Sequence, residues 1–261
     1  MILHNLFSGL RERKESALIA YFTGGFPTLA ASAETIRTLA ENGTDLIEIG
    51  VPFSDPVADG PVIQQASTTA LQNGATLRGI LDMVRGLNVD IPLVLMSYLN
   101  PLLAYGWSEC IADARAAGVS GFIVPDLPVD AADTYLPDCR DAGLDLIFLA
   151  APTSTDSRIR AIAKKGSGFI YAVSVTGTTG VREGLPQNLP DFVERIRGET
   201  ALPVAVGFGV SKAEQIQTLS PIADGVIIGS RLIRAVMDGE DLSALVRNFK
   251  SATRRSSEET S

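Results

Sequence analysis

The stretch NGTDLIEIG (residues 42–50) contains the pattern that decides the fold. Within this stretch Gly43 follows a helix-like segment and comes just before a short run of mainly apolar residues. Similar phrases occur at AGVSGFIVPD (117–126) and AGLDLIFLA (142–150). Glycine adopts the left-handed conformation that ends many helices, and a short apolar run is typical of a strand covered on both faces. Each phrase therefore indicates the end of a helix and the start of a buried parallel strand.

Eight strand-like runs alternate with longer amphipathic segments that predict helices, such as LAASAETIRTLAENG (29–43) and AADTYLPDCRDAG (131–143). The runs are ALIAYFT (17–23), DLIEIG (45–50), PLVLMSY (92–98), GFIVPD (121–126), DLIFLA (145–150), GFIYAVS (168–174), PVAVGFG (203–209) and GVIIGS (225–230). Eight strands, each followed by helical sequence, predict an α/β fold of the (β/α)8 type, a TIM barrel. A doubly wound open sheet is the competing fold, and the number of units favours the barrel.

The rest of the chain completes this prediction. We expect an additional N-terminal helix over residues 2–14, and a polar tail over about 251–261 that is disordered. No linker or break in composition divides the sequence, and a barrel of this length commonly forms one unit. We therefore expect a single domain over residues 1–261.

Composition narrows the classes of function. The net charge of −8 argues against nucleic acid or an anionic membrane as the main partner. No run approaches the roughly 20 apolar residues of a membrane span, and the N-terminus carries charges where a signal peptide is apolar. Cys110 and Cys139 lie in helix-like stretches without the spacing of a metal site, so we expect reduced packing residues. A cytoplasmic enzyme is the resulting expectation.

In an α/β barrel the active site gathers at the carboxyl ends of the strands. The only histidine, His4, lies in the expected N-terminal helix, and no lysine projects from a strand end. No cluster of Cys, His and carboxylate suggests a metal site. Proton transfer at the strand ends would therefore have to use carboxylates and tyrosine.

Glu48 is the first candidate, because it lies inside the apolar strand DLIEIG. Alternation along a strand places Leu46 and Glu48 on one face and Ile47 and Ile49 on the other. With the β-branched face covered by helices, Glu48 points into the barrel near its mouth. A carboxylate there should have a raised pKa, as acid–base catalysis near neutral pH requires. A structural glutamate paired with an arginine across the barrel is the alternative.

Asp55 and Asp59 follow in the proline-broken loop PFSDPVADGP (52–61). Pro61 suits the first position of a helix, so on local grounds Asp59 is better explained as a residue that complements the positive end of that helix. Asp55 is explained as well by an Asx-type turn. Neither residue is assigned to catalysis by its local sequence.

The last two strand ends indicate a phosphate site. VGFGVSKAEQI (206–216) places Gly207 and Gly209 at one strand end, with Ser211 able to cap the next helix, and Gly229 with Ser230 opens another helix. Small-residue turns and a helix N-terminus present backbone N–H groups to a phosphate dianion, and barrels often bind phosphate after strands seven and eight. The alternative is that these glycines only shape tight turns.

The sequence resembles the tryptophan synthase α subunit family. The resemblance rests on PFSDPVADGPVIQ after LIEIG, on VGFGVS and on the later Gly-Ser, and it extends from about Leu6 to the last helix. It implies a lyase of tryptophan biosynthesis that cleaves indole-3-glycerol phosphate to indole and D-glyceraldehyde 3-phosphate by a retro-aldol reaction. It also implies that neither a metal nor an organic cofactor takes part.

The same resemblance assigns roles to individual residues. Glu48 and Asp59 match the two catalytic acids, Tyr171 matches the tyrosine beside the glutamate, and Thr179 is a possible partner for Asp59. The phosphate-binding positions are matched by Gly180, Gly209, Gly229 and Ser230, and the walls of the indole pocket by Tyr21, Leu99 and Phe208.

The family's α subunits pair with a β subunit that uses pyridoxal phosphate, in an α2β2 heterotetramer. The resemblance places Asp55 at that contact, together with the loop that contains Asn100 and Pro101. Three rival interpretations stay open at this point. They are a stand-alone indole-3-glycerol phosphate lyase that releases free indole, a phosphate-binding barrel isomerase, and a non-catalytic barrel that regulates a partner. The absence of a strand-end histidine and lysine argues against the isomerase.

Overall fold

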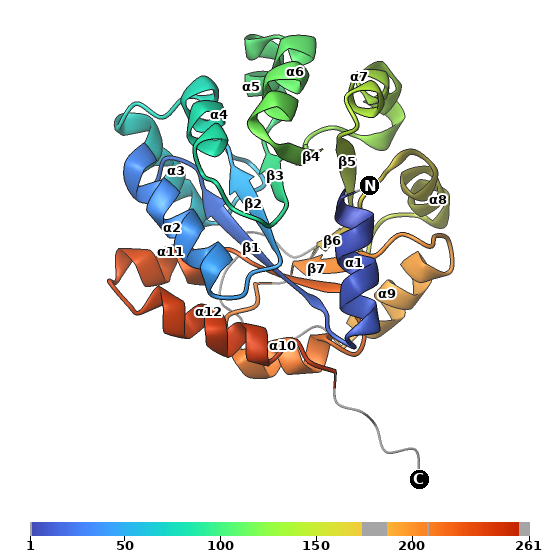
Figure 1. The fold of residues 1–261 in the computed structure, drawn as a ribbon. Coiled ribbons are helices and arrows are strands. Elements are labelled where there is room, and N and C mark those ends of the chain that lie inside the picture. Colours follow the sequence, from blue (N-terminus) through green and yellow to red (C-terminus); the bar gives the residue numbers. More distant parts are fainter. Residues whose placement is uncertain (1, 174–186, 208, 256–261) are drawn as a thin grey trace.

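A computed structural model describes residues 2–173, 187–207 and 209–255 of the chain. Eight parallel strands form a closed barrel in chain order, and the last strand pairs with the first (Figure 1). The strands are β1 (Ala17–Thr23), β2 (Leu46–Gly50), β3 (Leu93–Met96), β4 (Val119–Ile123), β5 (Asp145–Ala150), β6 (Ile170–Val173), β7 (Val204–Gly207) and β8 (Gly225–Ile228). The predicted (β/α)8 barrel is confirmed, and the open sheet is excluded because β1 pairs with both β2 and β8.

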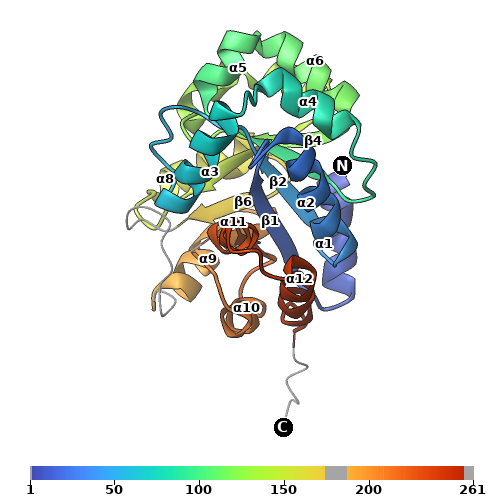
Figure 2. The same ribbon diagram turned by 90° about the vertical axis from the view of Figure 1, so that its left-hand side faces the viewer.

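Helices surround the barrel on its outer side (Figures 1 and 2). The exception is α1 (Ile2–Glu12), which packs against the barrel interior, and the outer helices of the first half are α2 (Leu29–Glu41), α3 (Pro61–Gln72), α4 (Leu77–Arg85), α5 (Leu99–Tyr105) and α6 (Trp107–Ala117). Those of the second half are η1 (Val129–Thr134), α7 (Leu136–Asp141), α8 (Asp156–Lys165), α9 (Leu189–Arg197), α10 (Ala213–Leu219), α11 (Ser230–Met237) and α12 (Leu242–Ser251). The predicted N-terminal helix is present as α1.

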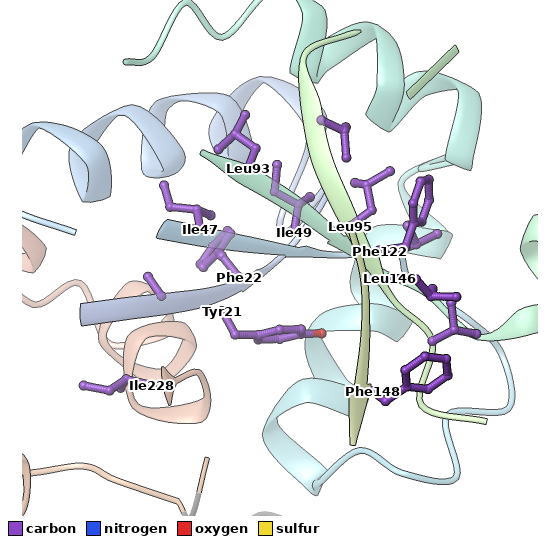
Figure 3. Packing of buried hydrophobic residues seen from close by; sticks show 14 of the residues in the cluster. Tyr21, Phe22, Ile47, Ile49, Leu93, Leu95, Phe122, Leu146, Phe148 and Ile228 are labelled. Carbon is purple, nitrogen blue, oxygen red and sulfur yellow. The ribbon is translucent and has the colours of Figure 1, made fainter. Parts of the chain in front are cut away.

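Strand alternation divides the core into two layers. Residues such as Phe22, Ile47 and Ile49 pack outward against the helices, as Figure 3 shows for the neighbouring strands β1 and β2. Residues such as Ile19 and Leu46 fill the barrel interior. Because side chains alternate along each strand, every second residue of β2 points into the barrel interior. Glu48 is one of these residues.

Helix α1 belongs to the inner layer. Its buried residues Leu3, Phe7 and Leu10 pack with the barrel interior, and the ring of Phe7 lies 5.7 Å from that of Phe169, just before β6. This end of the barrel lies below the amino ends of the strands. The additional helix therefore closes the base of the barrel and leaves the opposite end as the mouth.

The first glycine of the phrase AGVSGFIVPD, Gly118, has the predicted left-handed conformation. Gly118 follows α6 with φ = +92°, and its N–H donates to the carbonyls of Ala114 and Arg115. Gly143, in the phrase AGLDLIFLA, has φ = +69° after α7. Residues that carry a side chain rarely adopt a positive φ. The two glycines therefore allow the chain to leave a helix and enter the next strand directly.

Two segments differ from expectation. The helix expected over 131–143 is divided into η1 and α7, because Pro137 lacks an N–H and its ring would clash with a preceding turn. The segment that contains Asn100 and Pro101, expected as a loop, is part of α5. Pro101 is tolerated there because the first turn of a helix has no intrahelical partner for its N–H groups.

The last described residues are packed rather than extended. Lys250 in α12 pairs with Asp45 (2.9 Å) and Glu15 (3.1 Å) at the base of the barrel. Thr253 is buried, and Arg255 donates to the carbonyl of Ala223 (3.0 Å). The expectation of a disordered tail from about residue 251 is therefore wrong for residues 251–255, while residues 256–261 lie outside the described part of the chain.

Candidate active site

Glu48 lies in the middle of β2 and points into the barrel, as strand alternation predicts. The residue has no exposed surface, and neither carboxyl oxygen has a hydrogen-bond partner among the described residues. Burial away from water disfavours the charged form, and it raises the pKa of Glu48 to about 8. The alternative of an arginine paired across the barrel finds no support in the described part of the chain, where no basic group reaches this carboxyl.

Tyr21 is the neighbour of Glu48 on β1. The two residues are register partners across the β1–β2 pair, so both side chains project into the barrel. Figure 3 shows the ring of Tyr21 on the side of β1 opposite to Phe22. Burial is the main cause that holds the pKa of the Tyr21 phenol well above its usual value, and the charge of Asp59 adds to it. Tyr21 is therefore a protonated hydroxyl at neutral pH.

Tyr171 faces the same space from β6. Burial and then the nearby charge of Glu48 hold the pKa of its phenol well above the usual value. A Cβ atom placed on Gly207 of β7 would lie only 2.6 Å from Cε1 of this ring. The absence of a side chain at Gly207 is therefore what allows Tyr171 to lie across β7 at the mouth.

Asp59 lies in the loop between β2 and α3, with 8% of its surface exposed. The helix begins as predicted with Pro61 in its first turn, but its N-cap residue is Gly60 and no side chain caps it. The carboxyl of Asp59 instead forms a hydrogen bond with the phenol of Tyr98. Burial raises the pKa of Asp59 to about 6, although the Tyr98 hydroxyl lowers it. The explanation of Asp59 as a helix-capping side chain is not supported by this geometry.

Tyr98 is a functional candidate that the sequence analysis missed. Its hydroxyl accepts the Ala58 N–H (2.8 Å) beside Asp59, and its ring lies 5.4 Å from that of Phe53. Tyr98 thus holds both ends of the loop that carries Asp59. The signal was present in PLVLMSY (92–98), because alternation places position 98 on the same face as Val94, which fills the barrel interior.

Leu99 and Asp55 form hydrogen bonds with partners other than Glu48 and Asp59. Leu99 is half-buried at the start of α5, and its N–H donates to the Asp126 carboxylate (2.8 Å). Asp55 is exposed and accepts a hydrogen bond from Ser54 (2.5 Å). Its backbone carbonyl, not its side chain, accepts the Val57 N–H (2.9 Å), so the Asx-type turn is not observed.

A surface next to the mouth joins this loop to α5. Val57 is 85% exposed and Leu103 of α5 is 45% exposed, both unusually high for large apolar residues. Tyr98 connects the two segments, since it precedes α5 and binds the loop at Ala58. The exposed Asp55 and Asn100 lie on the same two segments, and Pro101 follows Asn100 in the first turn of α5.

The residues predicted to bind phosphate at the ends of β7 and β8 lie only partly within the described part of the chain. Gly229 is the N-cap of α11 and Ser230 is its first residue, as expected. Gly209 has φ = +69°, a conformation that favours glycine. The proposed cap by Ser211 is wrong: Lys212 is the N-cap of α10, and the Gln215 side chain accepts the N–H groups of both residues. Thr179, Gly180 and Phe208 lie outside the described residues.

The described residues contain neither a cluster of metal-ligating side chains nor a membrane-spanning helix. No group of three or more His, Cys, Asp and Glu side chains that could hold a metal ion occurs among them. None of the helices described is both long and apolar enough to span a membrane. Cys110 and Cys139 are both buried with free thiols, in agreement with the prediction of packing residues.

The fold and the two buried acids define an enzyme class, a (β/α)8-barrel with acid–base groups at the carboxyl ends of its strands. Comparison with known proteins then gives the family. The sequence profile of the family "Tryptophan synthase alpha chain" matches residues 7–260. The chain belongs to this family.

Individual relatives agree with the profile. The tryptophan synthase alpha chain of Methanosarcina mazei is 47% identical over 250 residues, which cover 94% of this chain and 92% of the relative. That of Dehalococcoides mccartyi is 47% identical over 232 residues, covering 88% of this chain and 91% of the relative. A chain in the structure of Mycobacterium tuberculosis tryptophan synthase superposes with a TM-score of 0.93 at 39% identity, covering 97% of this chain and 98% of its own length.

Proposed function

We propose that this chain acts as the α subunit of tryptophan synthase and cleaves indole-3-glycerol phosphate, with Glu48 and Asp59 as its catalytic acids. The observation that carries the residue assignment is the pair of acids with different pKa values. Glu48, near 8, holds its proton at neutral pH, whereas Asp59, near 6, is ionised. Two carboxyl groups with separated pKa values can take opposite roles in one reaction.

Glu48 begins the reaction as a general acid. It transfers its proton to C3 of the indole ring, which makes that ring cationic and weakens the bond from C3 to the glycerol chain. The bond electrons return to the ring as the C–C bond breaks. The Glu48 carboxylate then takes the proton of the hydroxyl on the adjacent carbon, which becomes the aldehyde of glyceraldehyde 3-phosphate. The enzyme ends the cycle in its starting protonation state.

Asp59 supports the charge that appears on the ring. As a carboxylate it accepts the ring N–H and stabilises the cationic intermediate, an effect that is strong in a site removed from water. Tyr171 orients Glu48 from β6. The phosphate is held by Gly180, Gly209, Gly229 and Ser230, and the indole ring lies between Tyr21, Leu99 and Phe208. The protein thereby holds the substrate with its reacting carbon near Glu48.

The partner in this proposal is a tryptophan synthase β subunit in an α2β2 heterotetramer. Asp55, Asn100 and Pro101 form the contact, and the exposed Val57 and Leu103 support it because apolar groups at a surface favour burial by a partner. Pyridoxal phosphate belongs to the β subunit alone. The α reaction uses no cofactor, and the assembly works in the cytoplasm.

The test is an assay of indole release from indole-3-glycerol phosphate, with and without a β subunit. We expect Glu48→Gln to lower kcat by about 10³-fold, since it removes the transferable proton, and Asp59→Asn by about 10²-fold. The controls are Glu41→Gln and Asp141→Asn, which make the same changes at exposed positions on α2 and α7. Retention of activity by Glu48→Gln contradicts the mechanism. Turnover that a β subunit leaves unchanged contradicts the subunit assignment and supports a stand-alone lyase.

A further inference from the structure

The position of Tyr21 is determined by two glycines on the strands that flank β1. A Cβ atom placed on Gly229, at the end of β8, would lie 3.0 Å from Cδ1 of the Tyr21 ring. A Cβ atom placed on Gly50, at the end of β2, would lie 2.6 Å from Cζ, with the hydroxyl still closer. The ring therefore extends across the mouth from the β8 side to the β2 side. Its hydroxyl lies above β2, two residues beyond Glu48 on the same inner face.

This hydroxyl lies within the electrostatic reach of both acids. Asp59 and Glu48 each make ionisation of the Tyr21 phenol less favourable, and Asp59 has the larger influence. The phenol is buried, with only 6% of the residue exposed. It remains protonated throughout the pH range in which the two acids titrate, so it stays able to donate a hydrogen bond within reach of both charges.

Glu48 has need of such a donor during the reaction. Neither of its oxygens has a partner among the described residues, which suits a neutral acid at rest. Once the proton has moved to the indole ring, a carboxylate is left in a site with no contact to water. A buried charge without a hydrogen bond is strongly disfavoured, so a nearby donor would lower the free energy of the state that follows proton transfer.

The groups that face Glu48 are few. Tyr171 approaches from β6 and Tyr21 from β1, and the charge of Asp59 in the loop after β2 acts on both phenols. Thr23, two residues beyond Tyr21 on the same face of β1, carries a buried hydroxyl that acts on the Tyr21 phenol. Val94, the register partner of Glu48 on β3, is apolar and carries no donor. Asp59, when ionised, is an acceptor and cannot donate to a carboxylate. Among these described groups Tyr21, Tyr171 and Thr23 carry hydroxyl donors, and the phenols of Tyr21 and Tyr171 are the two on which the charge of Glu48 acts.

We propose that Tyr21 is a positioning residue whose hydroxyl donates a hydrogen bond to the Glu48 carboxylate formed when the indole ring takes its proton. This role is distinct from that of a wall of the indole pocket, which needs only the ring. No proton leaves the phenol: the Glu48 proton goes to indole C3, and the Tyr21 O–H remains intact while it donates. The inference rests on the proposed function, in which Glu48 is the acid.

The test is Tyr21→Phe, which keeps the ring and removes the hydroxyl. We expect kcat to fall about tenfold, because one hydrogen bond to a charged group is lost, while KM changes less than about twofold. Since a donor favours the ionised acid, its loss raises the pKa of Glu48. The alkaline limb of the kcat–pH profile, where Glu48 loses its proton, should move up by about one pH unit. Tyr135→Phe, which removes a hydroxyl beside Trp107 outside the barrel, is the matched control.

The outcomes separate the two roles and the two proposals. A raised KM with an unmoved alkaline limb would mean that Tyr21 only lines the pocket, and the inference would be overturned. An unchanged kcat would overturn it as well. If Glu48→Gln is inactive while Tyr21→Phe leaves the limb in place, the proposed function stands and only this inference fails. If Glu48→Gln keeps its activity, the proposed function itself fails.

Discussion

The raised pKa of Glu48 predicts a specific dependence of stability on pH. Glu48 has a pKa of about 8 in the folded protein and a reference value of 4.5 without burial. Between these values the folded protein binds a proton at Glu48 that the unfolded chain has lost. Stability therefore falls as pH rises, by about 1.36 kcal/mol per pH unit from this residue. From about pH 5 to about pH 7 the loss is on the order of 2–3 kcal/mol.

Glu48→Gln removes this loss because glutamine does not ionise. The assay is urea unfolding of the wild type and the variant at the two pH values. From the lower to the higher pH, we expect the free energy of unfolding to decrease more for the wild type than for the variant. The extra decrease should be about 2–3 kcal/mol. The difference of differences cancels the other titrating groups, which are the same in both proteins. Identical changes in the two proteins would refute the reasoning, because they would mean that Glu48 is ionised and stabilised in the folded state.

Three more predictions address the mouth and the base of the barrel. Tyr98→Phe removes the hydrogen bond that lowers the pKa of Asp59, so the acidic limb of the kcat–pH profile should move up by about one unit; an unmoved limb would show that this bond does not act on Asp59. Gly50→Ala forces the Tyr21 ring aside, so it should lower the free energy of unfolding, measured in urea, by about 1–3 kcal/mol and should also lower kcat. Full activity would mean that the ring has no fixed place. Lys250→Met removes the cation shared by two half-buried carboxylates, so it should lower the free energy of unfolding by about 2 kcal/mol. Because Lys250 lies at the end of the barrel opposite to the mouth, kcat should stay unchanged, and a change in kcat at equal folded fraction would contradict this separation.

The barrel could be predicted because its signals are local. Each of the eight apolar runs is short, and phrases such as NGTDLIEIG mark where a helix ends and a strand begins. The same local rule predicted that Glu48 points inward, because the two faces of a strand alternate regardless of what surrounds them. The errors were local as well. Pro137 divides an expected helix, and the segment after Tyr98 forms a helix instead of a loop.

The roles of the loop residues could not be predicted in this way. From its neighbours alone, Asp59 was better explained by the helix that follows it. The structure instead brings it to Tyr98, 39 positions along the chain, in a contact that no local pattern encodes. Tyr98 itself was missed because a tyrosine at the end of an apolar strand is usually a packing residue.

The sequence by itself determined the eight repeated units, the inward direction of Glu48 and the glycines that leave room at the strand ends. These properties depend on residue spacing and backbone freedom, which act over a few residues. Only the tertiary structure decided that Glu48 is fully buried and protonated, that Asp59 is held by Tyr98, and that the charges of both acids act on the Tyr21 phenol. The pKa of a carboxyl group depends on water, charges and donors within a few ångströms, and closure of the barrel brings those groups together from distant parts of the chain.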